Sequence, residues 1–211
     1  MWILFACLVS SIVLASILEG LLHQFVLHKG HKRFLWGVLF GAFRAHALEH
    51  HPEYRDDQYH RPAPEEESRI SLGWYTMPIV LTLLSPGIWA VWAWLGMGAG
   101  LIMIGTIVGY YIVYETFHWL MHFPHPGGRG RWFQRWRPLA AIFDWFDKRH
   151  YVHHLADDRN FNVILPFYDW LTGRYTIRIE QVPWAIRLRT WRNKRRAAAL
   201  KRRIAERRRA T

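Results

Sequence analysis

Three long apolar stretches dominate the pattern of hydrophobic and polar positions along the chain. They run over Met1–Leu22, Ile70–Leu84 and from Ile88 to about Tyr114. A helix that rises about 1.5 Å per residue needs about 20 residues to cross roughly 30 Å of hydrocarbon, so the first and third stretches are long enough to span a membrane. The second stretch is short for a span, and we expect it to be tilted or broken near Pro78. Residues 85–87, Ser-Pro-Gly, are typical of a turn and predict a helical hairpin. The apolar stretch 34–43 is too short to span and predicts a re-entrant or interfacial helix.

The charges orient these spans. Lys and Arg outnumber Asp and Glu by 28 to 16, a net charge of +12, and residues 187–211 alone carry twelve basic residues and one acid. Basic residues also follow the first span at 29–33 and the third span at 129–137, whereas the predicted turn has no charge. Because positive segments stay in the cytoplasm, we expect an external N-terminus and place every histidine group and the basic tail on the cytoplasmic side.

Composition narrows the chemistry. The one cysteine, Cys7, excludes an internal disulfide and a cysteine-based zinc or iron–sulfur site. No basic region precedes the first apolar stretch, which argues against a cleaved signal peptide. The basic tail follows membrane spans, so anionic lipid headgroups suit it better than nucleic acid, and a solvated helix that only fixes topology suits it equally well. We expect no nucleic-acid partner.

Ten of the thirteen histidines fall into four groups at metal-ligand spacing. The groups are His23 and His28; His46, His50 and His51; His118 and His122; and His150, His153 and His154. Residues three or four apart share a helix face, so two such imidazoles can reach one ion or two neighbouring ions. The five-residue separation of His23 and His28 fits a regular helix less well. Each doubled histidine points adjacent rings in different directions, which suits two ions.

Ten imidazoles exceed the capacity of one ion, so two ions are implied. Imidazole suits zinc, copper, iron and nickel, whereas structural zinc favours cysteine. An all-histidine site beside a bilayer fits two irons that activate O2. We expect carboxylates to orient the rings, with Asp157 and Asp158 as the first candidates and Glu115, Asp144, Asp147 and Asp169 as others. His31, His60 and His125 lie outside the pattern and are surface or supporting residues.

Five segments resemble the fatty acid hydroxylase / sterol desaturase superfamily. They are Glu19-Gly-Leu-Leu-His23-Gln-Phe-Val-Leu-His28, Gly109-Tyr-Tyr-Ile-Val-Tyr-Glu-Thr-Phe-His118-Trp-Leu-Met-His122, His150-Tyr-Val-His153-His154, Asn160-Phe-Asn162 and Asp169-Trp-Leu-Thr-Gly-Arg-Tyr175. The resemblance covers about residues 15–176, and the first and third segments look most like the fatty acid 2-hydroxylase branch. It implies that nine of the ten grouped histidines, all except His46, are ligands. The family usually has H-x2-HH in the second group, so either His46 ligates from a shifted helix or His60 takes that role.

The expected protein is an all-α integral membrane protein. It has about three to four transmembrane helices and a cytosolic helical cap over a histidine-rich di-metal site. Residues 1–180 would form this oxygenase domain and residues 181–211 a basic cytoplasmic C-terminal tail. By resemblance it is an O2-dependent non-haem di-iron hydroxylase, a monooxygenase, acting on a membrane lipid such as a fatty acyl chain.

Alternatives and partners stay open. The same two ions could desaturate a lipid or sterol. A zinc-dependent membrane hydrolase is a second alternative. Zinc could also replace iron in the purified oxygenase. A non-enzymatic metal-handling protein is a further possibility. No G-x-G-x-x-G motif or cysteine cluster is present, so electrons must come from an external donor such as cytochrome b5, or ferredoxin with its reductase. The lipid and the position of its oxidation stay undetermined.

Overall fold

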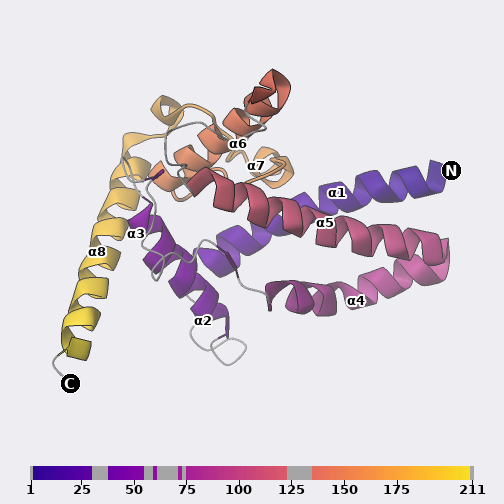
Figure 1. Cartoon of the computed structure of the whole chain (residues 1–211), viewed down its shortest axis with the longest axis horizontal. Helices are drawn as coiled ribbons and strands as arrows, with labels where there is room; N and C mark the ends of the chain where they lie inside the picture. Colours follow the sequence, from indigo (N-terminus) through magenta and orange to yellow (C-terminus); the bar gives the residue numbers. More distant parts are fainter. Residues whose placement is uncertain are drawn as a thin grey trace.

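The computed structural model describes residues 2–29, 38–54, 59–60, 71–72, 75–122 and 135–209. These residues form helices joined by turns, with no strand in the described ranges (Figure 1). The expected all-helical fold is therefore confirmed for this part of the chain.

Three helices are long and apolar enough to cross a membrane. They are α1 (Trp2–Leu22), which continues as the π-helix η1 (His23–Leu27), α4 (Thr76–Leu95) and α5 (Met97–His122). Helix α5 packs against both α1 and α4, and the N-terminus lies at the end of this bundle away from the remaining helices (Figure 1). We treat these helices as membrane spans, which agrees with the lower limit expected from the sequence.

The turn of the hairpin lies at Gly96, ten residues after the Pro86 on which the predicted turn is centred. Helix α4 continues without interruption past Pro86 to Leu95, and Gly96 is its C-cap. The φ of Gly96, 87°, is a left-handed conformation that glycine adopts without steric cost. Pro86 has no N–H for the carbonyl of Thr82, but the Ser85 hydroxyl donates to that carbonyl at 2.8 Å. A side chain thus replaces the missing backbone bond, as happens in membrane helices. The predicted turn at 85–87 is wrong.

The remaining helices gather at the opposite end of the bundle from the N-terminus, and we call this group the cap (Figure 1). They are α2 (Val38–Phe43), the π-helix η3 (Arg44–His50), α3 (His51–Glu53), α6 (Arg137–Leu155), α7 (Phe167–Leu171), the 3-10 helix η6 (Ile179–Gln181) and α8 (Trp184–Arg209). Residues 34–37 of the predicted re-entrant helix 34–43 lie outside the described ranges, and its residues 38–43 form α2.

One contact joins the cap to the bundle, and another holds the helices of the cap together. Helix α7 packs on α1, where the ring of Tyr168 covers Gly20 so closely that a Cβ at position 20 would overlap with it. Helix α8 packs on η3, α3 and α6, and its buried stripe includes Thr190 and Lys194. The first part of the predicted tail, in α8, is thus packed against the other helices of the cap.

Candidate metal centre

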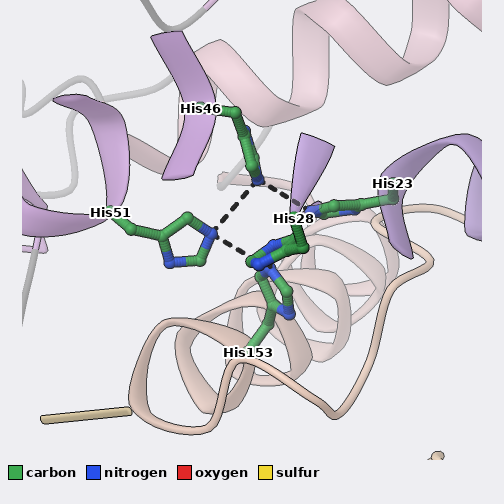
Figure 2. Close-up of side chains that lie close together, drawn as sticks. All are labelled: His23, His28, His46, His51 and His153. Atoms are coloured by element: carbon green, nitrogen blue, oxygen red, sulfur yellow. Dashed lines mark hydrogen bonds between the residues drawn. The ribbon is translucent and has the colours of Figure 1, made fainter. Parts of the chain in front are cut away.

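Five histidines from three parts of the chain form the first cluster, set A. Set A consists of His23, His28, His46, His51 and His153, and one ring nitrogen of each lies within 4.8 Å of those of the other four. The Nε2 atoms of His23 and His46 are 2.8 Å apart, and those of His51 and His153 are 3.2 Å apart. Figure 2 shows the five rings turned toward a common centre.

Four further histidines form set B next to set A. Set B consists of His50, His118, His122 and His150, again with ligand atoms within 4.8 Å of one another. The Nε2 atoms of His122 and His150 are 2.9 Å apart. His154 lies between the sets: its Nε2 is 3.2 Å from that of His150, and its ring stacks on that of His51 with centroids 4.3 Å apart. All ten grouped histidines therefore converge on one region.

The π-helices explain the awkward spacings. In a π-helix the N–H of a residue bonds the carbonyl five residues earlier. The N–H of His28 bonds the carbonyl of His23 at 3.2 Å, and the N–H of His51 bonds that of His46. Residues five apart then share a face, so both of these pairs enter set A. His50 points to set B instead, so the doubled histidine serves both sets, as its spacing predicts.

Backbone carbonyls define the tautomers of three rings. The Nδ1–H of His23 donates to the carbonyl of Phe161 at 2.6 Å, that of His153 to Arg159 at 2.7 Å, and that of His122 to Tyr59 at 3.2 Å. A neutral ring that donates from Nδ1 has a lone pair on Nε2. Those lone pairs face the centres of the two sets, where a cation could bind several of them at once. This donor set fits metal ions.

Burial keeps the rings neutral. Nine of the ten histidines are at most 4% exposed, and His28 is half-buried. Burial lowers the pKa of His51, His150 and His154 well below the usual value of 6.5, and the charges of neighbouring rings lower it further. Both ring nitrogens of His50 have no hydrogen-bond partner among the described residues. Neutral, buried and unsatisfied imidazole is the form that binds metal.

One loop supplies two of the three orienting carbonyls. Residues 159–164 follow α6 and present the carbonyls of Arg159 and Phe161 to set A. The Asp169 carboxylate accepts from the N–H groups of Phe161 and Asn162, both at 2.9 Å. Burial raises the pKa of Asp169 to about 6. These bonds hold the loop so that its carbonyls face the rings.

The side chains of Arg149 and Glu19 also bond to the backbone of this loop, Arg149 to its carbonyls and Glu19 to its N–H groups. Buried Arg149 donates to the carbonyls of Asn162, Val163 and Ile164 at 2.7, 3.0 and 2.9 Å. Glu19 of α1 accepts from the N–H of Val163 at 2.5 Å and from the Tyr110 hydroxyl at 2.6 Å. Sequence reasoning missed both roles. A carboxylate inside an apolar span is the signal that could have found Glu19, whereas an arginine before His150 carries no such signal.

The predicted carboxylates lie elsewhere. Asp157 accepts from the Thr190 hydroxyl at 2.7 Å and Asp158 pairs with Arg189 at 3.2 Å, so both contact α8 rather than a histidine ring. Asp147 accepts from the Tyr59 hydroxyl at 3.1 Å, and Glu115 accepts from the N–H of Leu72. Asp169 supports His23 only through the loop.

The structure also separates His46 from His60. His46 lies in set A, while the His60 side chain is 59% exposed and donates to the carbonyl of Met121 at 2.9 Å. His46 therefore joins the other grouped histidines and His60 does not. His31 and His125 lie outside the described residues.

Three cavities reach the histidines. A narrow apolar cavity of about 80 Å³ lies between α1, α4 and α5 and ends at His23. A second, of about 340 Å³, lies between η3 and α8 and reaches His28 and His51. A third, of about 440 Å³, lies along α8 and reaches His154, and Lys194 lines both of these. The site thus has an apolar approach from the spans and approaches beside α8 whose walls mix apolar and charged side chains.

Comparison with known proteins identifies no relative: no protein-family profile, no curated protein and no solved structure matches this chain.

Proposed function

We propose that this chain is a membrane-embedded, O2-dependent non-haem di-iron hydroxylase that acts on a fatty acyl chain of a membrane lipid. The observation that carries the proposal is the position of two adjacent histidine sets beside an apolar cavity between the membrane spans, which set A borders through His23. The resemblance of the histidine segments to the fatty acid hydroxylase / sterol desaturase superfamily supports it. Two ions held by set A and set B would supply the activation of O2.

The chain's own residues would bind and orient the substrate. The cavity wall includes Leu18, Leu22, Met77, Val80 and Ile107, so it suits hydrocarbon and excludes water. Its volume of about 80 Å³ is below the roughly 150 Å³ of a cavity that holds benzene. A linear chain segment suits it better than a fused ring system. Balanced chemistry gives R–H + O2 + 2e⁻ + 2H⁺ → R–OH + H2O, with both electrons from an external donor.

We also propose that the site and α8 face the cytoplasm. The histidine end of the bundle carries the basic residues of α6 and α8, whereas residues 87–100 around the turn at Gly96 have no charge. Moving the turn from residue 86 to residue 96 therefore leaves the charge asymmetry unchanged, and the asymmetry places basic segments in the cytoplasm.

The test is lipid analysis together with metal analysis. The chain is expressed in a lipid-rich bacterial host under isotopically labelled O2, and its extracted lipids are analysed by mass spectrometry. We expect lipids that gain one labelled oxygen and about two iron ions per chain. The His118→Ala and His154→Ala variants should lose the labelled product and bind less iron, whereas His60→Ala, at an exposed histidine outside both sets, should retain the product and both ions.

Other outcomes discriminate the alternatives. Loss of two hydrogens without oxygen gain would identify a desaturase. Two zinc ions with turnover under anaerobic conditions would identify a hydrolase and refute the oxygenase. Full product from both His118→Ala and His154→Ala would exclude the histidine centre altogether.

A further inference from the structure

We infer that the two histidine sets are not equivalent: set A forms an exchangeable position that meets the substrate, and set B forms a sealed position. The inference rests on the proposed function in taking both sets as metal sites. It follows from where the cavities end and from how each set is enclosed.

Set A borders two of the cavities. His23 forms part of the wall of the apolar cavity between the spans. His28 and His51 form part of the wall of the cavity beside α8, together with Asn193 and Lys194. His28 is also the only half-buried member among the ten grouped histidines. An ion at set A therefore lies near a hydrocarbon cavity and also near a larger cavity whose wall includes the polar side chains of Asn193 and Lys194.

Set B is enclosed by packed side chains. Its four histidines are 0–2% exposed, and none of them lines any of the three cavities described above. The rings of Tyr54 and Tyr59 lie 4.5 and 4.7 Å from that of His122, measured between centroids. Tyr59 belongs to the buried core between α5 and α6 that also contains Met121 and Phe143.

These enclosures set different barriers to ion release. An ion leaves when an imidazole swings away from it, which requires free volume beside the ring. At set A the ring of His28 or His51 can move into the cavity of about 340 Å³. At set B a ring moves only if the core between α5 and α6 opens, which is a larger and rarer event than local motion. The substrate carbon likewise meets set A, since His23 is the histidine at the apolar cavity.

The experiment measures ion release. The full chain in detergent is loaded with two zinc ions per chain and mixed with excess chromophoric chelator, while circular dichroism follows helix content. We expect one ion to leave roughly tenfold faster, or more, than the other. His28→Ala should leave only the slow ion bound at the start, and His122→Ala only the fast one.

A second pair of variants decides the question if the histidine variants do not fold. Leu48→Ala widens the cavity beside set A and should accelerate the fast phase alone. Leu188→Ala widens the third cavity, which reaches His154 but neither set, and should change neither phase. Equal release of both ions, or acceleration of the slow phase by Leu48→Ala, would overturn the inference. Binding of fewer than two zinc ions would instead overturn the di-metal proposal, and neither readout requires turnover.

Discussion

Replacing Arg149 with lysine tests how strongly the loop after α6 supports the centre. The Arg149 guanidinium makes three hydrogen bonds, one to each carbonyl of residues 162–164, and its side chain is fully buried. A lysine ammonium is a compact donor on a flexible stem and lacks the planar fork that reaches all three. We assume that it keeps one bond and loses two.

The magnitude follows from those two bonds. Hydrogen bonds to charged groups contribute about 1.5–3 kcal/mol each, so the loss amounts to about 3–6 kcal/mol. For a chain of this size 1 kcal/mol corresponds to about 2–4 °C, so we expect Tm to fall by on the order of 10 °C. Because the same loop carries the Phe161 carbonyl that orients His23, metal binding should weaken as well.

The assay is thermal unfolding in detergent, followed by tryptophan fluorescence, with bound metal measured on the same samples. Arg178→Lys is the matched control, since Arg178 is exposed and its replacement should leave Tm and metal content unchanged. If Arg149→Lys unfolds within about 1 °C of the unmodified chain, the loop does not depend on this arginine and the reasoning fails.

Three further results are expected. Gly20→Ala should disrupt the contact of α1 with α7 and lower the free energy of unfolding by about 1–3 kcal/mol. Gly105→Ala, with open space around it, should be neutral or slightly stabilising. Unfolding in detergent compares the two variants, and equal effects would contradict the packing argument. Burial lowers the pKa of His51, His150 and His154, so these rings stay neutral as the pH falls through 6.5. The metal content, measured by elemental analysis, should therefore stay constant from about pH 7.5 to about pH 6 and fall only as the pH passes the lowered pKa. Metal loss centred on pH 6.5 would show that the rings are exposed. The double variant Arg192→Glu and Arg195→Glu reverses two exposed charges on α8, and it should raise the KM for an acidic ferredoxin about tenfold and make that KM less dependent on salt. Turnover with a small-molecule reductant should stay unchanged. An unchanged KM would show that the electron donor binds to another surface.

Apolar length and histidine spacing predicted the parts of the fold that depend on composition. Span length follows from the thickness of hydrocarbon, so the three membrane helices were visible as runs of apolar residues. The turn was misplaced because Ser-Pro-Gly signals a turn only where no side chain replaces the lost bond, and Ser85 replaces it here. A contact of that kind depends on three-dimensional geometry that the letters do not record.

The candidate site shows the same division. The convergence of four groups followed from ligand spacing, but the place of His46 did not, because spacing arguments assume the α-helical period. The π-helix η3 changes that period and brings His46 level with His51. The orienting groups were expected to be carboxylates and are backbone carbonyls, which every residue possesses and which therefore leave no sequence signal.

The π-helices also tie the helical winding to the ions themselves. A π-turn is rare because the narrower α-helical winding is more stable for most sequences. In that narrower winding, His23 would turn away from His28, and His46 from His51. An ion held by set A favours the wider winding that brings these pairs together, so occupancy and winding form one linked equilibrium. Filling set A thus stabilises the π-helical winding of η1, at the end of the first span, and of η3 together, although residues 28–43 separate them in the chain.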